Sequence, residues 1–317
     1  MEDETVQGTN DDALGSKLSC INAGYLEDGF SQVFLKRAPK RPPIINRGTY
    51  CRTVGIDKIV HRFIQHYEKC QIVSLGAGSD SRYFLLKSKG LQPHLYVEVD
   101  FKDVTMKKAL TVYKNKKTNS MLENIVVENQ GSEIRSKDYW LIPGDLREFD
   151  TQLLPNLISK GLDTRYQQCY LMYSLPTLFV SECCLIYLDS SISNQIIASI
   201  TSQFNEPFLI CYEQILPSDA FGRVMLQNLK YRGIELPGIY DFPTLESHNE
   251  RFLSLNWKFV QSIDINTLWK TYIDENEKQR VQKLELFDEL EEWILLNDHY
   301  CIVVASKSDT YQLWYTD

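Results

Sequence analysis

The chain has 317 residues, of which 43% are hydrophobic and 12% aromatic, enough apolar side chains to fill a substantial core. Its formal net charge of -8 and its pI near 5.3 argue against a broad nucleic-acid-binding surface. The sequence contains no signal-peptide pattern, no run of eighteen apolar residues and no C-x-x-C pair among its eight cysteines, so we expect a soluble, reduced, cytoplasmic protein.

The N-terminal segment is predicted to be the least regular part of the chain. Residues 1–13 are acidic and lack a large apolar cluster, so we expect them to be disordered. The stretch KRAPKRPPIINRG, residues 36–48, carries three prolines and five basic residues, which predicts an extended connector. Asp57 can then cap a helix whose apolar positions fall on one face.

From residue 71 onward, strands and helices alternate. Apolar runs predict strands at QIVSL, HLYVEVDF, YWLIPGDL, TLFVSECCLIYLD and PFLICYEQI. Helical periodicity predicts helices at SRYFLLKSK, KDVTMKKALTVYKNK and SNQIIASITSQF. This alternation is typical of an open α/β sheet covered by helices on both faces. Cys183 and Cys184 fall in the middle of the fourth predicted strand.

After residue 216 the pattern loosens. SDAFGRVMLQNLKYRG is predicted to be helical and IELPGIYDFPTLE to be a loop, and the stretch from RVQKLELF to CIVVAS predicts a helix followed by an antiparallel edge strand. We therefore expect one domain over residues 1–317. Its predicted parts are an N-terminal lid (14–56), a cofactor-binding core (57–216), a substrate-side insertion (217–270), and a C-terminal helix and edge strand (271–317).

Two glycines one residue apart, Gly76 and Gly78, follow the first predicted strand. Ligands of open α/β sheets bind at the carboxyl ends of the strands, where glycine lets a nucleotide approach the backbone. Any tight strand-to-helix turn also favours glycine, so the pair alone is weak evidence for a ligand site. A dinucleotide fingerprint would have a third glycine at position 81, where this chain has Ser81, so NAD is disfavoured.

Carboxylates stand at the later strand ends. Glu98 and Asp100 lie about twenty residues after Gly78, where a carboxylate can accept hydrogen bonds from both ribose hydroxyls, and the alternative is an acidic cap of the next helix. Residues 144–146, GDL, end the third strand, and Glu182 lies in an apolar run where an unpaired charge is costly to bury. This arrangement suits an adenosine-containing cofactor without a diphosphate, and S-adenosylmethionine fits that description.

Motifs along the whole chain resemble those of one enzyme family. They are INRGTYCRTVGID, IVSLGAGSDSR, YVEVDF, GDLRE, SECCLIYL, YEQI followed by DAFGRVM, and LELFDELEEW, between about Leu14 and Ser306. On these motifs the chain resembles the leucine carboxyl methyltransferases, which methylate the C-terminal carboxylate of the protein phosphatase 2A catalytic subunit. The resemblance implies a class I, Rossmann-like α/β methyltransferase fold with N-terminal and insertion elements forming a lid. Ser74 and Asp80 depart from the acid and the third glycine usual in this fold.

The same resemblance implies a set of cofactor-binding residues. They are Lys17, Arg52, Gly76, Gly78, Asp100, Asp145, Leu146 and Glu182. Lys17 and Arg52 would hold the carboxylate end of the cofactor, and Glu182 its amino group. From the sequence alone, Lys17 could equally be a solvated helix residue and Arg52 an exposed cation.

The remaining implied positions follow the cofactor from its methionine portion to its base. Gly76 would lie beneath the methionine portion and Asp100 on the ribose, while Asp145 and Leu146 would frame the adenine. Arg52 is the one expected catalytic residue, because it would orient carboxylates. No general base is expected, since a C-terminal carboxyl with a pKa near 3.5 is already ionised at neutral pH. No cluster of residues has metal-ligand spacing.

Two other functions stay open at this stage. One is a related methyltransferase that acts on tRNA or on a small-molecule acid, although the tRNA-modifying relatives carry an additional propeller domain for which a chain ending at Asp317 leaves no room. The other is a scaffold that binds the cofactor without turnover. The expected partner is the C-terminal tail of the phosphatase catalytic subunit, with neither nucleic acid nor membrane, and the protein is expected to be a monomer.

Overall fold

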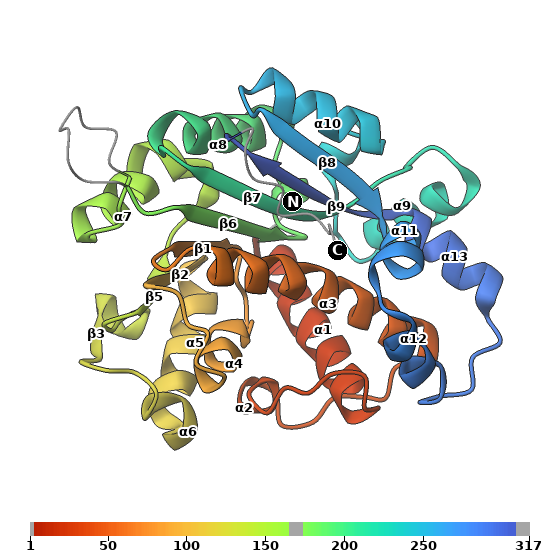
Figure 1. The fold of residues 1–317 in the computed structure, drawn as a ribbon, viewed down its shortest axis with the longest axis horizontal. Helices are drawn as coiled ribbons and strands as arrows, with labels where there is room; N and C mark the ends of the chain where they lie inside the picture. Colours follow the sequence, from red (N-terminus) through yellow and green to blue (C-terminus); the bar gives the residue numbers. More distant parts are fainter. Residues whose placement is uncertain (1–2, 165–173, 309–317) are drawn as a thin grey trace.

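The computed structural model describes residues 3–164 and 174–308, which form a central sheet with helices on both sides (Figure 1). The sheet is 9-stranded, with the order β3-β4-β5-β2-β1-β6-β7-β9-β8. The strands are β1 (Gln71–Leu75), β2 (Leu95–Asp100), β3 (Val126–Glu128), β4 (Glu133–Arg135), β5 (Tyr139–Pro143), β6 (Thr177–Glu182), β7 (Pro207–Gln214), β8 (Phe259–Asp264) and β9 (Tyr300–Ser306).

The direction in which the strands are added reverses at β1. From β1 the chain builds β2 and β5 on one side and β6 and β7 on the other, all parallel. β9 then pairs antiparallel with both β7 and β8. In open α/β sheets a ligand binds outside the carboxyl ends of the strands at such a reversal. The predicted Rossmann-like α/β fold is therefore confirmed, and it places a crevice between β1 and β6.

The longer helices cover the sheet in two layers. They are α1 (Asp3–Asn22), α3 (Pro43–His66), α4 (Arg82–Ser88), α5 (Lys102–Lys114), α7 (Leu154–Lys160), α8 (Ser190–Gln203), α9 (Ala220–Tyr231), α10 (Leu245–Ser254), α12 (Glu275–Gln282) and α13 (Leu290–Asp298). Short turns are α2 (Ser31–Phe34), α6 (Lys116–Asn119), α11 (Ile265–Thr267) and the 3-10 segment η5 (Pro237–Ile239).

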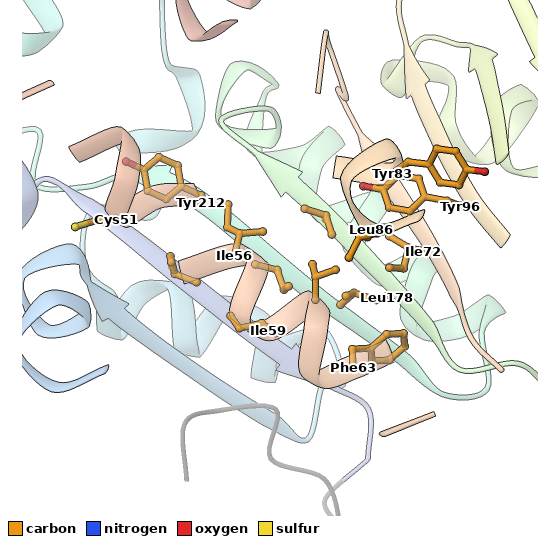
Figure 2. Close-up of a cluster of buried hydrophobic side chains, with 14 of the residues drawn as sticks. Cys51, Ile56, Ile59, Phe63, Ile72, Tyr83, Leu86, Tyr96, Leu178 and Tyr212 are labelled. Atoms are coloured by element: carbon orange, nitrogen blue, oxygen red, sulfur yellow. The ribbon is translucent and has the colours of Figure 1, made fainter. Parts of the chain in front are cut away.

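Alternate residues of the buried strands supply two separate apolar cores. Ile72 and Leu178 face the core covered by α3 and α4, where Ile59 and Phe63 pack against them (Figure 2). The intervening residues, including Val73, face the second core, which α8 and α10 cover. Because successive side chains of a strand point to opposite faces, strands buried on both faces are apolar throughout. This is why these strands could be predicted from the sequence.

The prediction of disorder at the N-terminus is wrong for residues 3–13, which form the first half of α1. Acidic residues in the first turn, Asp3 and Glu4, favour a helix N-terminus. Asp3 also pairs with Arg147 at 2.8 Å, and Asn10 hydrogen-bonds Ser79. These contacts are polar and distant in sequence, so the local composition did not show them. Residues 1–2 lie outside the described residues.

The predicted connector over residues 36–48 is confirmed for residues 36–42, which form no helix or strand, but it is wrong for residues 43–48, and the predicted helix start at Asp57 is also wrong. Helix α3 begins at Pro43, because proline is tolerated in the first turn, where its missing N–H has no intrahelical partner to lose. Asp57 lies in the interior of α3 and binds Arg82 instead of capping a helix. The helix runs across the predicted boundary between residues 56 and 57. Figure 1 shows it beside α1.

Three further differences concern strands. β9 was predicted to be the edge, but the edge is β8, which comes from the predicted insertion at 217–270. β3 and β4 extend the other side of the sheet and were not predicted. β6 ends at Glu182, and Cys183 has a φ of 51°, so the two adjacent cysteines follow the strand and do not lie within it. Residues 309–317 of the predicted C-terminal part lie outside the described residues.

Candidate cofactor and acceptor site

A cavity of about 650 Å³ lies at the carboxyl ends of β1, β2, β5 and β6, within the size range of small-ligand sites. All the predicted cofactor-binding residues line it. They are Lys17, Arg52, Gly76, Gly78, Asp100, Asp145, Leu146 and Glu182. The structure thus brings together residues that are as much as 165 positions apart in the sequence (182 − 17). Helix α1 contributes a further part of the wall, including Asn10 and Asp12.

The turn after β1 requires glycine because neighbouring side chains of the protein occupy the space that a Cβ atom would need. Gly76 and Gly78 have φ values of 64° and 51°, in the left-handed region that favours glycine. A Cβ on Gly76 would collide with Sγ of Cys184, and one on Gly78 with the side chain of Asn10. Asn10 clasps the turn: its Oδ1 accepts from Ser79 N at 2.7 Å and its Nδ2 donates to Ser79 Oγ at 3.0 Å. Helix α1 is therefore bound directly to the turn.

Asp100 is fixed to the same turn. Its Oδ2 accepts from Gly78 N and its Oδ1 from Phe101 N, each at 2.7 Å. Burial raises the pKa of Asp100, while these two N–H groups act in the opposite direction. Phe101 is the N-cap residue of α5 and has no side-chain cap, so the helix-cap alternative does not describe Asp100.

Glu98, the other predicted ribose candidate, lies outside the cavity. Its Oε2 accepts from the hydroxyl of Tyr139 at 2.7 Å and pairs with Nζ of Lys108 at 2.5 Å. Both members of the Glu98–Lys108 pair are fully buried, and burial raises the pKa of Glu98. Lys108 also donates to the carbonyl of Asp80 at 2.7 Å. The pair therefore supports the glycine turn from within the core.

Lys17 is held by acids, so the alternative of a solvated helix residue is excluded. Its Nζ lies 3.2 Å from Asp80 Oδ1 and 3.4 Å from Asp28 Oδ2, and it donates to Ser81 Oγ at 3.0 Å. Burial alone would lower the pKa of Lys17, but Asp80 and Asp28 raise it to about 12. Lys17 is therefore a charged part of the cavity wall.

Sequence reasoning missed Arg82, the most connected cation of the site. Its side chain is 4% exposed and pairs with Asp57 at 2.7 Å, Asp80 at 2.5 Å and Glu182 at 3.3 Å. Although burial would raise the pKa of Asp80, Arg82 and Lys17 bring it well below the usual range. The available signal was a charged residue directly after the glycine turn, at the start of the apolar stretch YFLL.

Arg52 pairs with Glu182 where two walls of the cavity meet. Its Nε lies 2.5 Å from Glu182 Oε1, and its guanidinium carbon lies 4.9 Å from the ring centroid of Tyr212. Burial alone would raise the pKa of Glu182, but Arg52 and Arg82 lower it overall. Tyr212 in turn stacks on Tyr300 with 5.4 Å between ring centroids. Arg52 is thus a partly buried, paired cation and not an exposed one.

Asp145 and Leu146 form the rim of the cavity beyond β5. Both oxygens of Asp145 accept from Nε of Arg147 at 2.9 Å, and Nη2 of Arg147 reaches Asp3 of α1 at 2.8 Å. Leu146 is buried and presents an apolar surface to the cavity. The rim is therefore tied to the first turn of α1.

A second part of the cavity wall, which we call the acceptor half, comes from β7, α9, residues 232–237 and the junction of α13 with β9. Its apolar and aromatic side chains are Tyr212, Leu229, Ile234, Pro237, Leu296 and Tyr300, and its polar ones are Gln214, Arg232, Glu235 and Asn297. Ile234 belongs to a small core with Ile186, Leu236 and Ile239. At the mouth, Arg232 pairs with Asp12 of α1. Among the described residues that line the cavity there is no histidine.

Comparison with known proteins identifies the family. The model of the family described as leucine carboxyl methyltransferase matches residues 25–201. A protein of Arabidopsis thaliana described as leucine carboxyl methyltransferase 1 homolog is 40% identical, over 95% of this chain and 88% of its own length. This chain belongs to the leucine carboxyl methyltransferase family. Leucine carboxyl methyltransferase 1 of Caenorhabditis elegans is also similar, with 35% identity over 96% of this chain and 92% of its own.

Another similar protein is named for tRNA wybutosine synthesis and not for leucine carboxyl methylation. The tRNA wybutosine-synthesizing protein 4 of Rattus norvegicus is 36% identical over 96% of this chain, but the match covers only 44% of that protein. Membership in the leucine carboxyl methyltransferase family confirms the predicted enzyme class, an S-adenosylmethionine-dependent methyltransferase. The role predicted for each individual site residue stays a prediction.

The residues of the cavity fit S-adenosylmethionine. An α-amino acid group needs a cation for its carboxylate and an anion for its amino group, and Arg52 and Glu182 supply the two side by side. Asp100 offers a fixed carboxylate at the end of β2, as ribose binding requires. In the described part of the chain no three acids, cysteines or histidines are placed to hold a metal ion.

Over residues 3–164 and 174–308, no helix combines the length and the apolar character that crossing a bilayer requires.

Proposed function

We propose that this methyltransferase transfers the methyl group of S-adenosylmethionine to the α-carboxylate of the C-terminal leucine of the protein phosphatase 2A catalytic subunit, giving a methyl ester. The observation that carries the proposal is the position of Arg52. Its guanidinium lies between the carboxylate of Glu182 and the ring of Tyr212, where the charged and apolar parts of the cavity meet. A guanidinium in that place can bind a second carboxylate arriving from the acceptor half.

The chemistry of the cavity suits an acceptor that is already ionised. A C-terminal carboxyl has a pKa of about 3.5, so the attacking oxygen is negative at neutral pH without help from a base. Burial raises the pKa of Tyr300 to about 12 and that of Cys183 to about 11, so neither side chain can act as a base near neutrality. The family resemblance and this arrangement favour a carboxylate over a phenol or an amine.

The protein then contributes orientation and exclusion of water. When bound, S-adenosylmethionine supplies a methyl group made electrophilic by a positive sulfur. Arg52 orients the acceptor carboxylate, and the apolar walls keep water from the reacting oxygen, which strengthens the attraction between opposite charges. Holding the two reactants in line also removes much of the entropic barrier.

The acceptor half supports leucine as the terminal residue. Leu229, Ile234, Pro237 and Leu296 present aliphatic surface of the kind that a leucine side chain can bury. Complete burial of one such side chain contributes about 1.5–3 kcal/mol, a large share of the affinity of a short tail. A terminal acid or amide side chain would lose hydrogen bonds to water in the same place.

The setting of the reaction belongs to the same proposal. We infer that the protein acts as a monomer in the cytoplasm on the tail of the phosphatase subunit, without nucleic acid or membrane. The described cysteines are all free thiols, as expected in a reducing compartment.

One parallel assay tests the acceptor. The protein is incubated with methyl-labelled S-adenosylmethionine and, separately, with the intact phosphatase catalytic subunit, the subunit without its terminal leucine, tRNA and a panel of small acids. We expect label only in the intact subunit, and we expect mild base to release it as methanol. Label that persists after removal of the leucine, or that survives base, would contradict the proposal.

A second candidate acceptor comes from the rat relative, whose name refers to tRNA wybutosine synthesis. The tRNA sample of the same assay decides between the two, because label in tRNA and none in the phosphatase favours this candidate. Cofactor binding without transfer to any acceptor would instead support a scaffold.

A further inference from the structure

The central cation of the ion-pair network contacts one acid outside the cavity. Arg82 donates from Nε to Asp57 Oδ1 at 2.7 Å and from Nη1 to Asp80 Oδ2 at 2.5 Å. Its third nitrogen, Nη2, lies 3.3 Å from Glu182 Oε2. Asp80 and Glu182 line the cavity, whereas Asp57, in the interior of α3, is not one of the lining residues. Arg82 is therefore the side chain that connects Asp57 directly to the cavity wall.

We propose that Asp57 is a positioning residue for cofactor binding. By holding the guanidinium of Arg82, it leaves Oε1 of Glu182 to Arg52 and keeps the Glu182 carboxylate oriented for the amino group of S-adenosylmethionine. The inference rests on the cofactor of the family and is independent of the identity of the methyl acceptor.

The distances show which contact Asp57 restrains. The contact of Arg82 with Glu182, at 3.3 Å, is the longest of its three ion pairs, while the contact with Asp57 is 2.7 Å. Guanidinium and carboxylate groups favour two parallel hydrogen bonds when both are free to turn. Because the Arg82 side chain is only 4% exposed, the loss of a charged partner there is costly. Without the charge of Asp57, Arg82 gains by turning toward Glu182.

Asp80 cannot take up this movement, because two other cations hold it. Lys17 Nζ lies 3.2 Å from Asp80 Oδ1, and Lys108 Nζ donates to the Asp80 carbonyl at 2.7 Å. Glu182 is therefore the carboxylate toward which the Arg82 guanidinium would move. The other oxygen of Glu182 is paired with Arg52 at 2.5 Å. A second bond from Arg82 to Glu182 would compete with Arg52 and with the amino group of the cofactor for the same carboxylate.

The test is the variant Asp57→Asn, which keeps the shape of the side chain and one acceptor oxygen but removes the charge. Calorimetry should show a Kd for S-adenosylmethionine raised about tenfold, the effect of losing one well-oriented charged contact. The Kd for S-adenosylhomocysteine should rise by the same factor, because both ligands carry the amino group. The kcat at saturating cofactor should fall by a smaller factor than the Kd rises, because Asp57 acts on Arg52 indirectly, through Arg82 and Glu182.

Two further variants separate positioning from general damage. Asp57→Glu retains a carboxylate on α3 and should keep the Kd within about threefold of the parent value. Asp138→Asn is the matched control. It breaks a partly buried ion pair of 2.7 Å with Lys87 on α4, the helix that begins at Arg82, and Asp138 does not line the cavity. Its Kd should not change.

Several outcomes would overturn the proposal. They are an unchanged Kd in Asp57→Asn, an equal loss in Asp138→Asn, a loss for S-adenosylmethionine alone, and a fall in kcat at saturating cofactor without a rise in Kd. If Asp57→Asn does not fold, Asp57→Ser applies the same test, because serine also removes the charge but keeps an acceptor oxygen on α3. The Kd should again rise about tenfold.

Discussion

The two halves of the cavity recognise their ligands by different physical means. The cofactor half is bordered by a connected network of four acids and three cations. Asp80, Glu182, Lys17, Arg52 and Arg82 line the cavity, and Asp28 and Asp57 lie behind its wall. The acceptor half presents six aliphatic or aromatic side chains together with four polar ones. In the first half every one of these charges already has a partner, so binding exchanges one set of ion pairs for another. In the second half, binding buries apolar surface, so shape and size decide affinity.

The largest effect is expected at Arg52, where the two halves meet. Arg52→Lys keeps the positive charge but loses the planar fork that can hold two carboxylates at once. We expect kcat/KM to fall about 100-fold, in the range observed when one oriented donor is removed from an active site. Steady-state kinetics with both substrates varied measures this loss. If the lysine variant has the parental rate, Arg52 does not hold one carboxylate from each half of the cavity.

The next largest effect concerns the cofactor half alone. Asp100→Ala removes the acceptor expected at the ribose and releases the N–H groups of Gly78 and Phe101. Because each charge-assisted hydrogen bond contributes roughly 1.5–3 kcal/mol, we expect the cofactor Kd to rise at least tenfold. Calorimetry measures the change, and circular dichroism establishes that the variant is folded. If the Kd of the folded variant equals that of the parent, Asp100 serves the glycine turn and not the ligand.

A smaller effect is expected in the acceptor half. Leu296→Ala shortens a half-buried side chain of the acceptor wall, so the acceptor KM should rise about three- to tenfold while the cofactor Kd stays unchanged. The matched control is Leu290→Ala on the same helix, where the leucine is 56% exposed and does not line the cavity. A change in cofactor Kd for Leu296→Ala would contradict the separation of the two halves.

The last prediction is that the rate of methyl transfer does not depend on pH near neutrality. The rate at saturating substrates should be flat from about pH 6 to 8, because the acceptor carboxyl titrates near 3.5. In the cavity, Arg52 and Arg82 lower the pKa of Glu182 against the effect of burial, so it stays ionised as the pH falls to 6, and Tyr300, with its pKa raised to about 12, stays protonated at pH 8. A rate that rises with pH across this window would indicate an acceptor or a base that must lose a proton.

The sequence predicted the core of this fold better than its borders. Strands such as β1 and β6 are continuous apolar runs because both of their faces are buried, and this signal is local. The place of β9 between β7 and β8 is not local, since it depends on pairing partners up to about a hundred residues away. The start of α3 was missed because its prolines were taken as helix breakers, although Pro43 stands in the first turn, where proline is tolerated.

The same difference between local and distant interactions explains which site residues could be predicted. Gly76, Asp100 and Glu182 stand at the ends of predictable strands, so the sequence located them. Lys17 was located only by resemblance, because the acids that bury it come from distant segments. Arg82 was missed for a related reason. A single charged residue at the start of a short helix carries no periodic signal, and its three partners lie on α3, on the glycine turn and at the end of β6.

The placement of β9 has a consequence for how the chain is made. β8 pairs only with β9 among the described strands, and one edge of β7 is also covered only by β9. During translation, β7 and β8 therefore emerge before the strand that joins them. Until residues 300–306 leave the ribosome, the nascent protein exposes the buried apolar edge of β7, and open strand edges of this kind favour aggregation. Ribosome stalling before β9 should therefore leave a chain that depends on chaperones.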